Sequence, residues 1–253
     1  MDVIILAGGF GTRLSEYTDV TPKPMIEIGG KPILLHIIDQ YSKYKISNFY
    51  IAMGYKSEVI VKYFLKNKYS EEICKQEIIK VSDYNKEYIN KKIDIRLVQT
   101  GKDTMTGGRV RRMKKFIDSE NFMVTYGDGI SNVNIDKLLE FHKSHSKIGT
   151  VTGVRPPARF GELEILDNLV ISFKEKPQMQ KGWINGGFFI FKKTFFDQIE
   201  SDKTLLEREP LEKLTANKEL LAFKHEGFWQ CMDNKRDYDL LQKIWVNNNK
   251  SWQ

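Results

Sequence analysis

The sequence predicts an α/β fold with a mixed, mostly parallel sheet flanked by helices. An apolar run at 3–7 ends in a glycine-rich loop, and a helix pattern, a strand pattern at 48–54 and a second helix pattern follow it. This order is typical of parallel strands that are joined by crossover helices. After residue 148 short strand patterns follow one another closely, which predicts antiparallel strands added in the second half. We therefore expect a Rossmann-like sheet with these additions.

The first half alternates strands and helices. Residues 3–7 are continuously apolar, as in a strand that is buried on both faces. After Pro32, apolar residues recur at helical spacing and predict a helix. The polar, lysine-rich segment 68–92 predicts a mixture of helix and loop. The other elements expected here are an extended segment at 23–28, a strand at 48–54, a helix around 59–64, a strand at 93–100, a basic helix at 107–115 and a strand at 122–128.

The second half contains a helix pattern followed by closely spaced strands. Asp167 and Asn168 separate two strand patterns and predict a hairpin turn. The absence of a Pro-, Gly- or Ser-rich linker predicts one domain over residues 1–253. The elements expected here are a helix at 134–145, strands at 148–156, 161–166, 169–176 and 182–191, a helix at 205–217, a strand at 220–225 and a helix at 236–245.

Composition excludes several classes of protein. The chain has 253 residues, of which 41% are hydrophobic, so it can bury a core. Its net charge of +7 suits an anionic small molecule or a nucleic acid. Two cysteines and four histidines form no zinc or disulfide pattern and fit a reducing cytoplasm. The apolar stretch at 3–7 is too short for a signal peptide or a membrane span, so we expect a cytoplasmic protein without membrane insertion.

The stretch ILAGGFGTRL, residues 5–14, poses the question of what its loop binds. A dinucleotide fingerprint requires glycines at G-x-G-x-x-G, and here Gly9 and Gly11 match but Leu14 takes the third place. A phosphate-binding P-loop requires G-K-[ST], which is absent. A plain turn between strand and helix is the remaining structural interpretation.

Two cations favour a phosphate-binding role for this loop. Arg13 lies within it, and Lys23 follows between two prolines that stiffen its backbone. Glycines allow close approach of the backbone to an anion, and Arg and Lys neutralise that anion. The combination favours a polyphosphate over a dinucleotide.

Further motifs follow in a fixed order along the chain. They are LAGGFGTRL with TPKPM downstream, TGKDTMTGGRVRR (100–112), YGDG (126–129), EKP (175–177), INGGFF (184–189) and GFWQCMDNKRD (227–237). Over nearly its whole length the chain resembles the sugar-phosphate nucleotidyltransferases, and in particular their glucose-1-phosphate cytidylyltransferase branch. The resemblance implies a nucleotide-binding half at about 1–130 and a sugar-binding half at about 131–253.

The reaction implied by the resemblance joins CTP and α-D-glucose 1-phosphate to give CDP-glucose and pyrophosphate, for deoxysugar and surface-polysaccharide synthesis. A phosphate monoester is largely dianionic at neutral pH, because its second pKa is about 6. It can attack without a general base, so the protein has to position and neutralise anions. This explains why the motifs contain no catalytic triad.

The resemblance also implies roles for individual side chains. Asp128 and Asp233 would hold one Mg²⁺, although a turn aspartate before Gly129 and the N-cap of the last helix are the structural alternatives. Arg13 would hold the β- and γ-phosphates, and Lys23 the α-phosphate. The implied catalytic residues are Arg13, Lys23, Asp128, Lys176 and Asp233.

The implied binding residues fall into two groups. Lys176 would grip the attacking phosphate, and Glu175 and Asn185 would bind sugar hydroxyls, although a β-bulge alone could explain INGGFF. The sugar-phosphate group is Glu175, Lys176, Asn185, Gly186 and Gly187. The nucleotide group is Leu6, Ala7, Gly8, Gly9, Gly11, Thr12, Arg13, Lys23, Thr106, Gly107, Arg109 and Gly127.

The basic run at 106–115 has two other interpretations, a solvated helix face and a nucleic-acid patch. No aromatic residue interleaves its cations, so we expect no nucleic acid as a partner. Tyr126 and Trp229 are interpreted as packing residues.

Some positions depart from the cytidylyltransferase pattern. Cys231 stands where that pattern usually has proline, Asn234 where it has threonine, and 179–183 also differs. The difference at 179–183 leaves another phosphorylated acceptor open, and another nucleotide is a further alternative. A non-catalytic regulator that binds sugar nucleotides is a third alternative, which the retained Arg13, Lys23, Asp128, Lys176 and Asp233 disfavour. A nicotinamide oxidoreductase is disfavoured by Leu14 and Arg13. The resemblance implies a homo-oligomer.

Overall fold

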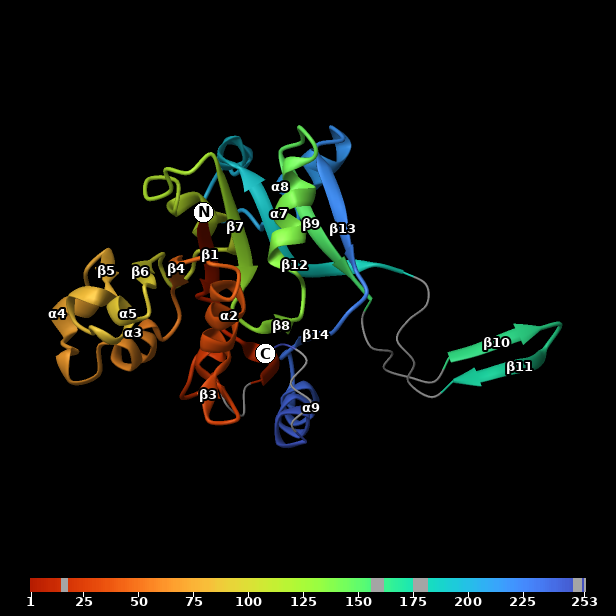
Figure 1. Cartoon of the computed structure of the whole chain (residues 1–253), viewed down its shortest axis with the longest axis horizontal. Coiled ribbons are helices and arrows are strands. Elements are labelled where there is room, and N and C mark those ends of the chain that lie inside the picture. The colour runs from red at the N-terminus through yellow and green to blue at the C-terminus, as the bar shows by residue number, and fades with distance from the viewer. Residues whose placement is uncertain (15–17, 156–161, 175–181, 248–251, 253) are drawn as a thin grey trace.

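The predicted parallel core is present in the computed structural model of the chain (Figure 1). The structure describes residues 1–14, 18–155, 162–174, 182–247 and 252. Strand β1 (Asp2–Ala7) pairs in parallel with β4 (Asn48–Met53) and β7 (Asn121–Tyr126), and β4 pairs in parallel with β6 (Asp94–Gln99). Every residue of β1 is buried, because the sheet is covered on both faces.

Strands from the second half extend this sheet. β12 (Ile184–Lys192) runs antiparallel to β7 and to β9 (Gly149–Val154), and β13 (Leu220–His225) runs parallel to β9. At the other edge β5 (Ile78–Lys80) runs antiparallel to β6. Among the described residues the eight strands follow the order β13-β9-β12-β7-β1-β4-β6-β5. The predicted mixed, mostly parallel sheet with added antiparallel strands is confirmed, although β5 lies where only helix and loop were expected.

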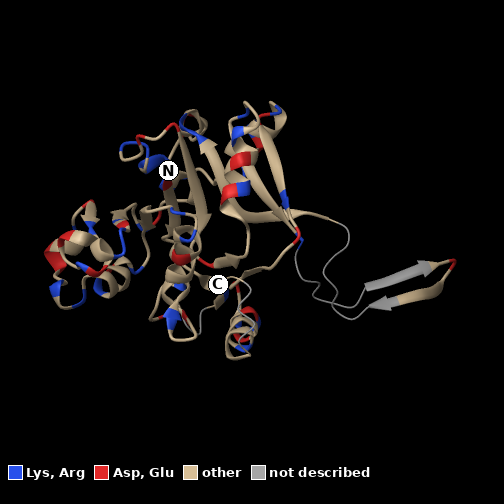
Figure 2. Ribbon diagram, in the orientation of Figure 1, with Lys and Arg blue, Asp and Glu red and all other residues tan. Residues whose placement is uncertain are grey.

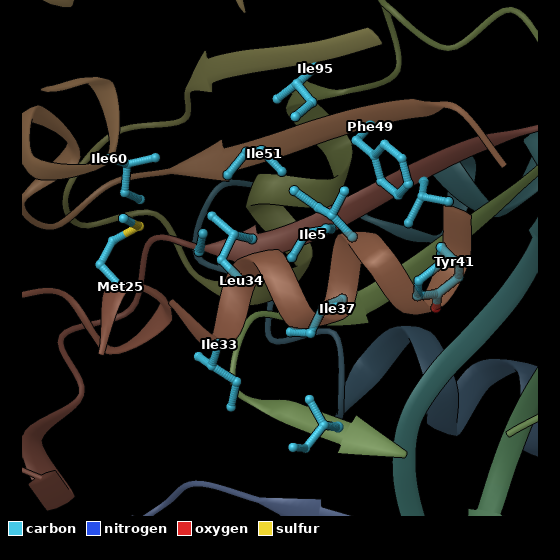
Figure 3. Packing of buried hydrophobic residues seen from close by; sticks show 14 of the residues in the cluster. Ile5, Met25, Ile33, Leu34, Ile37, Tyr41, Phe49, Ile51, Ile60 and Ile95 are labelled. Carbon is cyan, nitrogen blue, oxygen red and sulfur yellow. The ribbon is translucent and has the colours of Figure 1, made fainter. Parts of the chain in front are cut away.

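Alternate residues of β1 enter two different cores. Ile5 belongs to the core that contains residues of α2 (Ile33–Ser42), α3 (Ser57–Leu65), α7 (Ile135–Lys143) and α9 (Lys235–Val246). Figure 3 shows this core, in which side chains of α2 pack against those of the sheet strands. Ile4 belongs to the core that contains residues of α6 (Thr106–Arg112), the 3₁₀ turn η5 (Lys193–Gln198) and α8 (Glu209–Ala216). The helices therefore form a layer on each face of the sheet.

Short elements complete the fold. β8 (Gly129–Ser131) pairs antiparallel with β14 (Trp229–Cys231), an arrangement that the sequence patterns did not predict. β10 (Glu162–Leu166) and β11 (Leu169–Lys174) form the predicted hairpin, with Asp167 and Asn168 both at positive φ in its turn. The others are β2 (Glu27–Ile28), β3 (Lys31–Pro32), α4 (Glu71–Cys74), α5 (Glu87–Asn90) and the 3₁₀ turns η1 (Thr12–Leu14), η2 (Lys23–Met25), η3 (Lys66–Lys68) and η4 (Val81–Asp83).

Charged residues of both signs occur on the helices that surround the sheet (Figure 2). Within the described part of the chain, no helix has the length and apolar character needed to cross a membrane.

Candidate active site

The carboxyl ends of β1, β4, β6 and β7 meet at one edge of the sheet. Gly8, Gly54, Thr100 and Gly127 directly follow these four strands. The backbone joins the ends, since the amide of Gly127 donates to the carbonyl of Leu6 at 3.0 Å. Open α/β sheets bind ligands at this edge, and the glycine loop begins there.

The guanidinium of Arg109, on α6, ties these strand ends together. It donates to the carbonyls of Met53 (3.1 Å) and Gly8 (2.8 Å) and to the hydroxyl of Thr100 (2.6 Å). Burial lowers the pKa of Arg109 to about 10, so the group stays charged at neutral pH. A Cβ atom on Gly8 would lie 2.2 Å from Nη1 of Arg109, so only glycine fits at this position without displacing the guanidinium.

Lys23 forms the centre of a charged cluster beside the glycine loop. Its Nζ atom lies 2.8 Å from Oδ2 of Asp128 and 2.8 Å from Oδ1 of Asp233. Arg13 contacts the other oxygen of Asp233 at 2.7 Å. Burial lowers the pKa of Lys23, but the two carboxylates outweigh it and raise that pKa above its ordinary value. Lys23 is therefore a fixed ammonium ion held between two carboxylates.

The β8–β14 pair explains how the two aspartates meet. Asp128 precedes β8 and Asp233 follows β14, and the amide of Met232 donates to the carbonyl of Asp128 at 2.8 Å. The strand pairing therefore positions the backbone on both sides of the cluster.

Asp233 is not the N-cap of α9, as one interpretation allowed. Asn234 is the N-cap, and its Oδ1 atom accepts from the amide of Asp237 at 3.1 Å. Asp237 returns the contact by accepting from the amide of Asn234, which completes a capping box. The helix end is satisfied by these neighbours, so the Asp233 carboxylate remains available to Lys23 and Arg13.

Two cavities of the described chain border this charged cluster. The first, of about 410 Å³, is lined mainly by the glycine loop, by residues 102–106 and by Arg109. The second, of about 610 Å³, lies toward β12, β14 and the start of α9. Arg13, Tyr126 and Asp128 line both cavities. Ligands in the two cavities would therefore approach each other at the cluster.

The family model for nucleotidyl transferases matches residues 2–243, which is nearly the whole chain. The chain belongs to the nucleotidyltransferase family.

Relatives and solved structures agree with this assignment. This nucleotidyltransferase is 44% identical to a glucose-1-phosphate cytidylyltransferase of Salmonella typhimurium, over 100% of the chain and 99% of the relative. It is 37% identical to a probable glucose-1-phosphate cytidylyltransferase of Bacillus subtilis, over the same shares of the two chains. The crystal structure of HddC from Yersinia pseudotuberculosis superimposes with a TM-score of 0.71 at 26% identity, covering 96% of this chain and 99% of that one.

Most of the nucleotide-binding residues predicted for this nucleotidyltransferase line the first cavity. They are Leu6, Ala7, Gly8, Gly9, Gly11, Arg13, Lys23, Thr106, Arg109 and Gly127. Thr12 lies in η1, and Gly107 packs against the backbone of Thr204, so neither is among the described residues that line this cavity. The binding roles of all twelve residues stay predictions.

The predicted sugar-side residues divide differently. Asn185 lines the second cavity, and its Oδ1 atom accepts from the amide of Gly187 at 2.8 Å. The β-bulge alternative also holds here, since the pairing of β12 with β9 shifts register after Asn185 and Gly187 has a φ of +79°. The carbonyl of Gly186 accepts from Nε1 of Trp229 at 2.7 Å. Glu175 and Lys176 lie outside the described residues, so their predicted roles remain untested.

The basic run at 106–115 forms mostly ion pairs on the protein surface. Arg112 contacts Asp202 at 2.6 Å and Lys114 contacts Asp197 at 2.8 Å. Arg109 differs from them because it is buried at the strand ends. The interpretation of the run as a solvated helix face therefore describes its outer cations.

Sequence reasoning gave no binding role to several residues that line the cavities, among them Tyr126, Glu207 and Trp229. Tyr126 packs against the core that contains Ile4, as expected, but it also lines both cavities and donates its hydroxyl to Oε1 of Glu207 at 2.7 Å. Glu207, which lines the second cavity, was not singled out at all. The only sequence signal at Glu207 is an acidic residue just before a helix, which is common at helix starts.

Cys231, one of the positions expected to depart from the cytidylyltransferase pattern, also lines the second cavity. Burial, reinforced by Asp233 and Asp128, raises the pKa of this thiol to about 12. The thiol is therefore protonated at neutral pH and is not an activated nucleophile.

Proposed function

We propose that this nucleotidyltransferase joins CTP and α-D-glucose 1-phosphate to form CDP-glucose and pyrophosphate. The observation that carries the proposal is that Arg13 and Asp128 lie where two cavities meet, with Lys23 paired to Asp128. A reaction between two phosphorylated substrates requires such a junction, since their phosphates must come into contact. The 44% identity to the Salmonella typhimurium glucose-1-phosphate cytidylyltransferase over the whole chain supports the choice of substrates.

We assign CTP to the first cavity and the sugar phosphate to the second. The first cavity begins at the glycine loop, where the backbone can approach a triphosphate closely. The second cavity has Asn185 and Glu207 in its wall, which can hydrogen-bond a neutral sugar ring. Arg13 reaches both cavities and can neutralise phosphates on either side.

The chemistry then needs positioned cations rather than a proton relay. A phosphate oxygen of the sugar 1-phosphate attacks the α-phosphorus of CTP, and the bond from that phosphorus to the bridging oxygen breaks. The electron pair leaves with pyrophosphate, and the attacking dianion needs no base. Lys23 and Arg13 stabilise the charge that develops on the phosphates.

The carboxylates of Asp128 and Asp233, which hold the ammonium of Lys23, could also bind a magnesium ion. One cation, the ammonium of Lys23, already lies 2.8 Å from an oxygen of each carboxylate. Mg²⁺ is usually bound by one or two carboxylates, by water and by substrate phosphates, so a pair of aspartates suits it. Among the described residues there is no group of three or more His, Cys, Asp or Glu side chains that could hold a metal ion. When bound, Mg²⁺ would offset the negative charge of the phosphates.

Further parts of the proposal concern the whole protein. We propose that residues 1–253 form one domain, with the nucleotide bound mainly by residues 1–130 and the sugar mainly by 131–253. We also propose a homo-oligomer in the cytoplasm, where Cys74 and Cys231 would stay reduced. Its product would enter deoxysugar and surface-polysaccharide synthesis.

Pyrophosphate release tests the proposal. The purified protein is incubated with Mg²⁺, each of the four nucleoside triphosphates and a panel of sugar 1-phosphates. We expect release with CTP and glucose 1-phosphate to exceed that with any other pair. Release with UTP but not with CTP would contradict the assignment of CTP as the nucleotide substrate. No release with any pair would contradict the proposal that the protein is a nucleotidyltransferase enzyme.

A further inference from the structure

Glu207 connects the walls of the two cavities. Its Oε1 atom accepts from the hydroxyl of Tyr126 and its Oε2 atom from the hydroxyl of Thr106, each at 2.7 Å. Thr106 lines the first cavity, Glu207 the second, and Tyr126 both. The carboxylate is therefore held from two sides at the boundary between the cavities.

The two donors are themselves fixed. The oxygen of Thr106 accepts from the amide of Leu206 at 2.9 Å, and the hydroxyl oxygen of Tyr126 accepts from Nδ2 of Asn185 at 3.2 Å. Each hydroxyl hydrogen is thereby directed at Glu207. A carboxylate oxygen can accept about two hydrogen bonds, so each oxygen of Glu207 retains capacity for one more.

The other carboxylates of the second cavity are already occupied. Asp128 and Asp233 pair with Lys23, and Asp237 accepts from the amides of Asp233 and Asn234 in the α9 cap. Within the described wall of this cavity, Glu207 is the carboxylate whose hydrogen-bond partners are neutral hydroxyls alone. Its negative charge repels phosphate but attracts hydroxyl donors.

We propose that Glu207 determines sugar specificity by accepting hydrogen bonds from hydroxyl groups of the sugar ring. This inference rests on the proposed function. The phosphate end of the sugar phosphate would lie toward Arg13, and the ring would lie toward Glu207 and Asn185, which share the wall of the second cavity. Because Tyr126 and Thr106 fix the carboxylate, it can select hydroxyls by position as well as by number.

Binding of CDP-glucose and of CDP, which lacks the sugar, distinguishes recognition of the sugar by Glu207 from a purely structural role of this residue. CDP-glucose and CDP are titrated by calorimetry into the wild-type protein, Glu207→Gln and Glu209→Gln. Glu209 is a matched control, since it is an exposed carboxylate two residues away in the first turn of α8. We expect Glu207→Gln to weaken CDP-glucose binding by about 10-fold or more, as for loss of a hydrogen bond to a charged group, and to leave CDP binding unchanged. Glu209→Gln should change neither affinity.

Turnover adds a second measurement. Glu207→Gln should raise the KM for glucose 1-phosphate but not for CTP, and should narrow the difference in kcat/KM between glucose 1-phosphate and galactose 1-phosphate. Tyr126→Phe, which removes one donor to Glu207, should produce a smaller loss of the same kind.

The outcomes separate the two proposals. Unchanged CDP-glucose binding by Glu207→Gln in an active protein would overturn the role of Glu207 alone. Equal losses for CDP and CDP-glucose would also overturn it, because they indicate a general disturbance of the site. Failure of the wild-type protein to turn over CTP with glucose 1-phosphate would overturn the proposed function and this inference with it.

Discussion

Lys23 and Asp128, which are 105 residues apart in the chain, form an ion pair of 2.8 Å in a largely buried position. The same ammonium group contacts Asp233 at 2.8 Å, so it neutralises both carboxylates that we propose as metal ligands. In the proposed reaction Lys23 contacts a phosphate of the substrate. Its ammonium group would therefore leave the two carboxylates and bind the phosphate when substrate and metal bind. At the proposed metal site, Lys23 would therefore compete with a divalent cation in the ligand-free protein.

Replacing this ammonium should make the site a better metal site. In Lys23→Met the carboxylates of Asp128 and Asp233 lose their shared cation, so we expect the ligand-free protein to bind Mn²⁺ about 10-fold more tightly or better. Electron paramagnetic resonance of free Mn²⁺ measures this affinity without turnover. The melting temperature of the variant should fall in chelator and recover with Mg²⁺. Lys31→Met, which removes a lysine that pairs with Asp39 instead, is the control. Equal Mn²⁺ affinity in the wild-type and Lys23→Met proteins would contradict the competition.

Neutralising either aspartate should remove turnover and preserve the fold. Asp128→Asn and Asp233→Asn keep the shape of the side chain but lose its charge, so we expect kcat to fall by roughly 100-fold or more. Asp128 lines both cavities and Asp233 the second, and neither belongs to the hydrophobic cores, so thermal unfolding should remain cooperative. Asp136→Asn, in the first turn of α7, should retain wild-type rates. Wild-type rates in both Asp128→Asn and Asp233→Asn would contradict the proposal that these two residues bind the metal.

The central part of the fold follows directly from local patterns. A short continuous apolar run that ends at glycines favours a strand covered on both faces, so β1 and the loop after it were predictable from residues 2–14. The pairing of β8 with β14 was not, because three residues carry too little periodicity to mark a strand. That pairing brings Asp128 and Asp233 together, so their proximity was expected only through the family resemblance.

For the remaining site residues, sequence patterns do not predict burial, helix capping or contacts between distant parts of the chain. Arg109 is the buried residue of the basic run at 106–115, and the local sequence pattern does not distinguish it from its exposed neighbours. Asp233 and Asn234 are both good N-cap residues, and only the backbone geometry assigns the cap to Asn234. The position of the Glu207 carboxylate depends on hydrogen bonds from Thr106 and Tyr126, which are far away in sequence.

A buried histidine should make stability depend on pH. His142 is hydrogen-bonded to Thr150 at 2.8 Å and to Asn121 at 3.1 Å, and burial, followed by the nearby His145, lowers its pKa to about 4. The unfolded chain binds a proton at a pKa of about 6.5, so below that pH it takes up a proton that the folded chain does not. The stability from this group is therefore complete above pH 6.5 and is lost as the pH falls toward 4.

Urea unfolding at pH 7 and pH 5 checks this prediction. The wild-type protein should lose roughly 1–2 kcal/mol of unfolding free energy from His142 between the two values. His142→Gln should be less stable at pH 7 but should show a smaller loss between pH 7 and pH 5. An equal loss in both proteins would assign the pH dependence to other groups, including His145, whose pKa burial also lowers.

Two adjacent glycines of the loop should respond differently to the same substitution. A Cβ atom on Gly8 would lie 2.2 Å from Nη1 of Arg109, whereas a Cβ atom on Gly9 would meet nothing within 4 Å. Gly8→Ala must displace a guanidinium that donates to backbone carbonyls at the strand ends, so we expect a loss of about 2–4 kcal/mol in unfolding free energy. Gly9→Ala should stay within about 0.5 kcal/mol of the wild-type protein.

Arg109 provides the decisive control for this pair. In an Arg109→Met background the guanidinium that crowds Gly8 is gone, so Gly8→Ala should cost less there than in the wild-type protein. The unfolding free energies of the four proteins, measured in urea, give the coupling between the two positions. An additive result, with the same cost for Gly8→Ala in both backgrounds, would show that the loop does not need glycine at position 8 to accommodate Arg109.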